Sequence, residues 1–148
     1  MARSEIDERL VTKLRERGLR VTSQRIMIHR ALCAQAQHLT AEQLLESVSE
    51  VLPGTSLPTI YATLELLEQL GLVRRFGTGN GAVLFDSRVD PHAHTICRRC
   101  GATTDLDGGG LSAQVAARAG ETGFVPDHTQ LVVWGLCRRC AAARLSAN

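Results

Sequence analysis

The sequence is poor in aromatic residues and contains no long apolar run. Phe, Trp and Tyr together make up 3% of its 148 residues, with one Trp and one Tyr. No apolar stretch approaches the roughly 18 residues that a membrane-spanning helix needs, and none follows the N-terminus that could act as a signal peptide. We therefore expect a cytoplasmic protein that makes no membrane contact.

Neither the composition nor the net charge is extreme. Hydrophobic residues make up 44%, charged residues 22%, and the formal net charge is +2, which is typical of a globular chain with one domain or two small ones. Both a solvated helix surface and a DNA-binding surface fit the local excess of positive charge near the N-terminus. Between positions 9 and 30 the only acid is Glu16, against Arg9, Lys13, Arg15, Arg17, Arg20, Arg25 and Arg30.

Apolar residues recur with helical spacing in four segments before residue 71. Thr22 and Thr40 are suitable N-caps for the second and third helix. Pro58 falls in the first turn of the fourth helix, where its missing N–H does no harm. The predicted segments are Glu5–Arg17, a helix opened by Thr22, a helix capped by Thr40, and Leu57–Leu70, which Ser56 or Thr55 caps.

Two short β-strands are predicted after the fourth helix. Leu72–Phe76 and Ala82–Asp86 flank a glycine-rich segment, residues 77–81, as in a β-hairpin. Short helices followed by a two-stranded wing indicate a winged helix-turn-helix over residues 1–86. In such a fold the Leu57–Leu70 helix enters the major groove of DNA.

Polar side chains near the start of this helix lie off its leucine stripe and are candidates for DNA contact. Their hydroxyls can bond phosphates or base edges, and the ring of Tyr61 could contact a thymine methyl group. The alternative for Tyr61 is a partly buried aromatic residue of the helix. The candidates are Ser56, Thr59, Tyr61 and Thr63.

The pattern changes after Asp86 and predicts a second, α/β unit over residues 87–148. The fold class is therefore α+β, and a unit this small needs a staple such as a bound metal. Extended segments are predicted at His92–Cys97, Ala102–Leu106, Gly123–Val125 and Gln130–Leu136, and a helix at Leu111–Ala119.

Four of the five cysteines form two CxxC pairs, Cys97/Cys100 and Cys137/Cys140, separated by 36 residues. In a reducing compartment this spacing predicts a structural zinc site of four thiolates rather than disulfides. The alternative is a thioredoxin-like redox pair, which usually opens a helix, whereas arginines lie between the thiols here. Cys33 falls in a helical pattern and is interpreted as a small buried hydrophobic residue.

Histidines and carboxylates gather around the first thiol pair. The i, i+2 spacing of His92 and His94 directs both side chains to one face of a strand, and Asp86 and Asp105 lie nearby in the sequence. Imidazole and carboxylate ligands suit Fe(II) or Mn(II) as well as zinc. The alternative is a pair of exposed histidines that bind nothing.

Several sequence blocks are weak alone and strong together. They are Gly18-Leu19-Arg20-Val21-Thr22-Ser23-Gln24-Arg25, His38-Leu39-Thr40-Ala41, Thr59-Ile60-Tyr61-Ala62-Thr63-Leu64 with Leu70-Gly71-Leu72-Val73, Pro91-His92-Ala93-His94-Thr95-Ile96-Cys97-Arg98-Arg99-Cys100-Gly101, and Trp134-Gly135-Leu136-Cys137-Arg138-Arg139-Cys140. With these blocks in order, the chain resembles the Fur (ferric uptake regulator) family of metal-dependent repressors over nearly its whole length.

The resemblance implies a winged-helix DNA-binding domain, an α/β dimerisation domain and a homodimer on a palindromic, double-stranded operator. It also implies a regulatory Fe(II) or Mn(II) at the hinge, in addition to the structural Zn(II). An ion that binds only one hinge angle well would shift the population towards it. By resemblance its ligands are His38, Asp86, His92, His94 and Asp105, and the first block adds Arg20, Thr22, Gln24 and Arg25 to the DNA-binding candidates.

Asp105 indicates the subtype. Iron-uptake regulators of the family typically have Glu at this position, whereas Asp resembles the PerR-type peroxide sensors. In that branch Fe(II) reacts with peroxide and oxidises a ligand histidine, by resemblance His38 or His92. A metal-uptake regulator without peroxide chemistry is the alternative. A further metal site of the family looks dismantled, which leaves His128 as a surface or structural histidine.

Two enzymatic functions fit the sequence less well. A small zinc metallohydrolase needs an open coordination position and a general base, and the chain has no HExxH motif. A thiol oxidoreductase is incompatible with tight zinc binding at the four thiols. We therefore expect no enzymatic activity and no small organic substrate.

Overall fold

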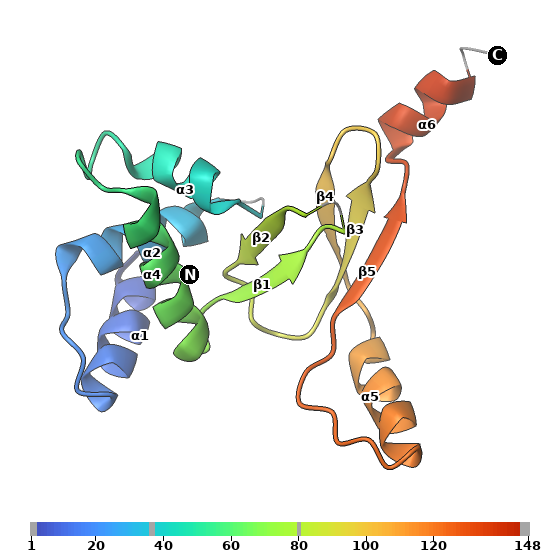
Figure 1. The fold of residues 1–148 in the computed structure, drawn as a ribbon, viewed down its shortest axis with the longest axis horizontal. Helices are drawn as coiled ribbons and strands as arrows, with labels where there is room; N and C mark the ends of the chain where they lie inside the picture. The colour runs from blue at the N-terminus through green and yellow to red at the C-terminus, as the bar shows by residue number, and fades with distance from the viewer. Residues whose placement is uncertain (1–2, 36–37, 80, 146–148) are drawn as a thin grey trace. The chain divides into compact units, whose positions relative to one another are not determined.

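The computed structural model describes residues 3–35, 38–79 and 81–145, and the chain divides into two compact units, Met1–Val89 and Asp90–Asn148 (Figure 1). The sequence pattern places the division slightly earlier, after Asp86. Each unit has its own β-sheet. No helix among the described residues combines the length and the apolar character that a membrane crossing requires.

Four helices and a β-hairpin make up the N-terminal unit. Every helix contributes buried side chains to one hydrophobic core. The predicted segments are confirmed, with ends shifted by one or two residues. The elements are α1 (Arg3–Glu16), α2 (Ser23–Ala34), α3 (Ala41–Val48), α4 (Leu57–Gln69), β1 (Arg74–Gly77) and β2 (Val83–Asp86).

The local sequence determines where α2 and α3 begin. The hydroxyl of Thr22 accepts a hydrogen bond from the backbone N–H of Arg25 at 3.3 Å, and Thr40 and Gln43 form a capping box. Both predicted caps are confirmed, because each hydroxyl satisfies a backbone donor that the first helical turn leaves open. Helix α4 has Ser56 at its N-cap position, but the Ser56 side chain makes no capping hydrogen bond, and Pro58 lies in the first turn.

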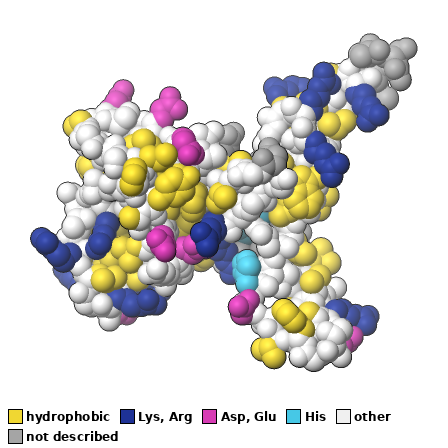
Figure 2. Space-filling model, in the orientation of Figure 1, with side chains coloured by type: hydrophobic (Ala, Val, Ile, Leu, Met, Phe, Trp, Pro, Cys, Tyr) yellow, Lys and Arg dark blue, Asp and Glu magenta, His cyan; other side chains and the backbone are white. Residues whose placement is uncertain are grey.

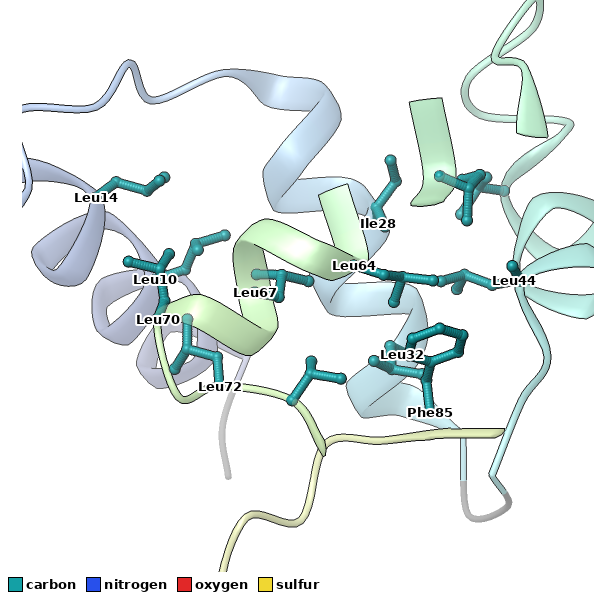
Figure 3. Packing of buried hydrophobic residues seen from close by; sticks show 14 residues of the cluster. Leu10, Leu14, Ile28, Leu32, Leu44, Leu64, Leu67, Leu70, Leu72 and Phe85 are labelled. Atoms are coloured by element: carbon teal, nitrogen blue, oxygen red, sulfur yellow. The ribbon is translucent and has the colours of Figure 1, made fainter. Parts of the chain in front are cut away.

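Helix α4 supplies the centre of the core. Its Leu64 and Leu67 lie between Leu10 of α1 and Leu44 of α3, and all four side chains are fully buried (Figure 3). Truncating a buried leucine to alanine typically costs about 2–5 kcal/mol, so these contacts hold α4 firmly against the other helices. A rigid helix is a suitable platform for recognition, because little ordering remains to be done on binding.

The hairpin is fastened to the segment that precedes α3. Strands β1 and β2 pair antiparallel, with Arg74 opposite Asp86. An isolated bridge then joins Phe85 of β2 to Leu39 through two backbone hydrogen bonds of 3.3 and 2.8 Å. The bridge directs the ring of Phe85 into the core, where it is buried.

A three-stranded sheet and two helices make up the C-terminal unit. The central strand, β3, is antiparallel to β4 and parallel to β5. The elements are β3 (Ala93–Cys97), β4 (Thr103–Leu106), α5 (Leu111–Glu121), β5 (Leu131–Gly135) and α6 (Arg138–Leu145) (Figure 1).

Two features of this unit differ from the sequence-based prediction. The segment Gly123–Val125 is not a strand, and both Phe124 and Val125 are exposed. Its composition favours β-structure, but a strand also needs a neighbour to pair with. Helix α6 was not predicted, because its apolar residues are mostly alanines and form no periodic apolar stripe.

The C-terminal unit leaves large apolar side chains exposed (Figure 2). Helix α5 buries none of its residues, and its Leu111 and Val115 are exposed. On β5, an edge strand, Val133 is 55% and Trp134 41% exposed. Exposed apolar side chains of this size favour an interaction with a partner surface.

Helix α2 buries a histidine for which the sequence predicts no role. His29 is 3% exposed, and its Nε2 lies 3.5 Å from the Sγ of Cys33, one turn later. Burial, together with the positive charge of Arg9, lowers the pKa of His29 to about 4 against the opposing charge of Asp7. Burial also raises the pKa of Cys33. Cys33 is therefore a neutral thiol beside a neutral imidazole, half-buried where the sequence pattern predicts a small buried hydrophobic residue.

We expect the N-terminal unit to lose stability as the pH falls from about 6.5 towards 4. Between about pH 6.5 and pH 4, His29 takes up a proton in the unfolded chain but not in the folded chain, and this favours unfolding. The folded state therefore keeps its full stability above about pH 6.5 and loses part of it as the pH falls towards the folded pKa of about 4. The loss should be on the order of 3 kcal/mol. Urea unfolding followed by helical circular dichroism measures it, and His29→Leu should lack this component. An identical pH dependence in both proteins would contradict the prediction.

Candidate functional site

Strand pairing brings the four cysteines of the CxxC pairs together. Cys97 at the end of β3 lies opposite Gly135 of the parallel strand β5, so the chain leaving β5 passes beside it. Cys137 and Cys140 lie just before and within α6. The four sulfur atoms lie within 4.8 Å of one another, and those of Cys100 and Cys137 are 3.7 Å apart. The predicted four-thiol cluster is confirmed.

The electrostatics of this cluster favour a bound cation. Hydrogen bonds from the backbone N–H groups of Cys137 and Cys100 lower the pKa of Cys97 to about 6, and the N–H of Ala102 lowers that of Cys100. Burial and the neighbouring thiols raise the pKa of Cys140 to about 12. Four thiolates this close cannot all ionise without a compensating cation, and a set of four sulfur ligands suits Zn(II).

In the C-terminal unit, three of the predicted N/O ligands converge. His94 lies opposite Asp105 in the β3–β4 register, and its Nε2 is 3.9 Å from Oδ1 of Asp105. The Nε2 of His92 lies 3.5 Å from the same oxygen. The two imidazole rings have centroids 4.5 Å apart, and both histidines are buried. They are therefore not a pair of exposed strand histidines.

A backbone contact orients the ring of His92. Its Nδ1 lies 2.8 Å from the carbonyl oxygen of Asp90. Since a carbonyl oxygen only accepts, Nδ1 carries the proton and donates it. This tautomer leaves Nε2 with the lone pair that a metal requires.

The N-terminal unit holds a second pair of predicted ligands. Nε2 of His38 lies 3.4 Å from Oδ2 of Asp86, and both side chains are buried. The other carboxylate oxygen of Asp86 accepts the backbone N–H of Arg88 at 2.7 Å, which turns Oδ2 towards the histidine. The bridge between Leu39 and Phe85, the adjacent residues, sets the spacing of the pair.

The donor atoms divide into two chemical classes. All nine residues predicted as ligands lie in groups able to hold a metal ion. The thiolates are soft ligands that favour zinc, whereas imidazole and carboxylate ligands also bind Fe(II) and Mn(II).

The start of α4 presents some of the predicted DNA-contacting side chains. Tyr61 is 45% exposed, and its hydroxyl donates to Oε1 of Glu42 in α3 at 3.3 Å. The hydroxyls of Ser56 and Thr59 lie 3.0 Å apart. Thr63 requires a correction: it is buried on the core-facing side of α4, and its hydroxyl donates to the Thr59 carbonyl at 2.9 Å. It is therefore not placed to reach DNA.

The predicted residues at the start of α2 have partners within the chain. The guanidinium of Arg25 donates to the carbonyl oxygen of Arg20, whose side chain is exposed. Nε2 of Gln24 donates to the hydroxyl of Thr55 at 3.2 Å. Thr22 acts as the helix cap. These contacts fix the backbone before α2 and leave Arg20 as the most accessible cation of the group.

Two residues beside Tyr61 escaped the sequence analysis. Glu42 accepts its hydrogen bond, and the ring of Phe85 contacts its ring edge-to-face. No local pattern marks either residue, because each contact joins segments that are distant in the sequence.

A unit of four helices and a β-hairpin, followed by an α/β unit, with a four-thiol cluster and His and Asp side chains able to bind a metal ion, is the architecture of a metal-dependent transcriptional regulator. The chain belongs to the Ferric uptake regulator family, whose pattern matches residues 16–134. The match confirms the resemblance that the sequence blocks indicated.

Known relatives agree with this assignment. The peroxide operon regulator of Bacillus subtilis strain 168 is 33% identical over 141 residues, which cover 95% of this chain and 97% of that protein. The Helicobacter pylori ferric uptake regulator shares the fold, with a TM-score of 0.78 at 20% identity over 95% of each chain. A zinc uptake regulator complexed with zinc and DNA has a TM-score of 0.73 at 26% identity, covering 98% of this chain and 99% of that one.

We expect Cys97→Ser to lose the metal held by the thiols, because only three sulfur ligands remain. Elemental analysis after desalting should show this metal falling from about one ion per chain towards none. The free energy of unfolding should drop by several kcal/mol. Cys33→Ser, which alters a thiol outside the cluster, is the matched control and should keep its metal. Full metal content in Cys97→Ser would contradict the assignment.

Proposed function

We propose that this protein is a peroxide-responsive repressor that acts in the cytoplasm. It binds a palindromic operator as a homodimer when Fe(II) or Mn(II) fills its regulatory site. The main support for this subtype is the identity of residue 105, an Asp that lies opposite His94 on the neighbouring strand. The family resemblance associates Asp at this position with peroxide sensors and Glu with iron-uptake regulators. The similarity to the B. subtilis peroxide operon regulator supports the same subtype.

In this proposal, the His38–Asp86 pair and the group of His92, His94 and Asp105 bind one regulatory ion together. Each group alone would supply only two or three ligands, which is few for Fe(II) or Mn(II), because these ions favour higher coordination numbers with N/O ligands. Zn(II) would occupy the four thiols and stabilise the C-terminal unit.

The regulatory effect follows from where the ligands lie in the chain. One pair belongs to the DNA-binding unit and the other three residues to the C-terminal unit, so full coordination favours the arrangement in which both groups meet. Only preferential binding to that arrangement can shift the population towards it. In the metal-bound dimer, this arrangement would hold the two α4 helices, one from each chain, at the spacing of the operator half-sites.

The exposed edge strand β5 supports the homodimer. In the described residues β5 is an edge strand that exposes Val133 and Trp134, and helix α5 exposes Leu111 and Val115; so many exposed apolar side chains are unusual on a monomer. A second copy of the same surface, related by a twofold axis, would cover these side chains. A monomeric mass in sedimentation equilibrium at working concentrations would contradict this part of the proposal.

We expect His94→Ala to abolish metal-stimulated DNA binding, because it removes a central ligand of the regulatory ion. Its affinity with Mn(II) should fall by about tenfold or more, measured by gel shift on a duplex that the Mn(II)-loaded wild type selects from a random library. The fold and the thiol-bound metal should persist. His128→Ala, which alters an exposed histidine, is the matched control and should bind normally. Undiminished Mn(II) stimulation in His94→Ala would refute the ligand assignment.

Peroxide sensing assigns a second role to the ligand histidines. His38, Asp86, His92, His94 and Asp105 would hold the Fe(II), which would supply the redox chemistry that activates the peroxide O–O bond. In the net reaction one oxygen atom of peroxide is inserted into a ring C–H bond of the histidine and the other leaves as water. The oxidised ring is a poorer ligand, so the site loses its ion and the dimer releases the operator.

We expect one added oxygen on His38 or His92 after the Fe(II)-loaded protein is treated with peroxide. Mass spectrometry of tryptic peptides detects it, and the exposed His128 of the same chain is the internal control for non-specific oxidation. Release of operator DNA should follow the same time course. Cysteine oxidation with both ligand histidines unmodified would instead favour a metal-uptake regulator or a thiol-based sensor.

A further inference from the structure

The side chain of Tyr61 is exposed, yet both its ring and its hydroxyl group contact other residues of the chain. Its ring packs edge-to-face on that of Phe85, with centroids 6.5 Å apart and an interplanar angle of 68°. Its hydroxyl donates to Oε1 of Glu42 at 3.3 Å. One partner belongs to β2 and the other to the first turn of α3, so two elements position a single side chain of α4.

The bond to Glu42 determines what Tyr61 can still recognise. A phenol has one O–H donor, and its oxygen also accepts. With the proton committed to a carboxylate, only the accepting capacity remains for DNA. Phosphate oxygens, thymine O4, and guanine O6 and N7 also only accept, whereas the amino groups at adenine N6 and cytosine N4 donate in the major groove.

We propose that Glu42 is a specificity-determining residue that makes Tyr61 a hydrogen-bond acceptor, so that Tyr61 favours adenine or cytosine, which carry an amino group, over thymine or guanine on the DNA strand that it faces. This role rests on the proposed DNA binding by α4. The carboxylate also acts through its charge, which disfavours a phosphate close to the same hydroxyl.

The surroundings keep Glu42 ionised and in place. A hydrogen bond from its own backbone N–H, followed by one from the Thr40 hydroxyl, lowers the pKa of Glu42, and a carboxylate is favoured in the first turn of a helix. The capping box of Thr40 and Gln43 fixes the backbone on which Glu42 sits. Phe85 is itself fixed in the core, next to Leu32 (Figure 3).

The test is the base preference of the full-length, Mn(II)-loaded protein in a random duplex library. The wild type should prefer adenine or cytosine over thymine or guanine on one strand at one position of each half-site, and Tyr61→Phe should lose that preference. Glu42→Ala should weaken it about fivefold, leave the other positions unchanged and bind random DNA at least as well. In the Tyr61→Phe background, Glu42→Ala should add nothing, since the hydroxyl through which it acts is absent.

Two variants separate the hydrogen bond from the charge. Glu42→Gln keeps an acceptor oxygen without the charge and should retain the preference. Glu46→Ala removes an equal charge from an exposed position of the same helix and should retain it too. An unchanged preference in Glu42→Ala, or an equal effect in the Tyr61→Phe background, would overturn the proposal. Selection of no sequence at all by the wild type would instead refute DNA recognition by this protein.

A second readout requires no DNA. Tyr61 is the only tyrosine of the chain, so the absorbance of tyrosinate reports its titration alone. Partial burial, then the charge and the hydrogen bond of Glu42, raise the pKa of Tyr61. Glu42→Ala should therefore lower this pKa, and Glu46→Ala should not. The same pKa in Glu42→Ala and wild type would show that carboxylate and phenol are not in contact in solution.

Discussion

The register of strand β3 is the constraint on which both donor groups of the C-terminal unit depend. This five-residue strand is paired on both sides, which places His94 opposite Asp105 and Cys97 opposite Gly135. Because successive side chains of a strand point to opposite faces, a slip of one residue would turn every donor to the wrong side. A metal at the four thiols would therefore also hold the register on which the imidazole ligands depend.

The N-terminal unit has a comparable tie in the bridge between Leu39 and Phe85. The candidate ligands His38 and Asp86 lie immediately outside this bridge, and the ring of Phe85 contacts Tyr61 on α4. Two backbone hydrogen bonds thus connect the geometry of the candidate ligands with the geometry of the helix proposed to contact DNA. A shift of His38 and Asp86 would therefore reach Tyr61 through the bridge and Phe85, and all of these residues lie in one compact unit.

Local sequence patterns predicted the parts of the molecule that depend on local chemistry. The caps at Thr22 and Thr40 and the four-thiol cluster follow from residue type and spacing, which the fold preserves. The misses depend on contacts between distant segments. Thr63 has a suitable hydroxyl but faces the core. His29 is buried by contacts with other segments, which the sequence of its own helix does not reveal. Gly123–Val125 has the composition of a strand but pairs with no other strand among the described residues.

Helix α5 buries none of its side chains, and this makes the stability of the C-terminal unit depend on the concentration of the protein. An isolated helix of 11 residues is marginal in water, so its persistence depends on a cover for Leu111 and Val115. With a second chain as that cover, folding of the C-terminal unit and self-association become a single equilibrium, and stability increases with protomer concentration. Dilution alone would then silence the regulator, with no change in metal or oxidant supply.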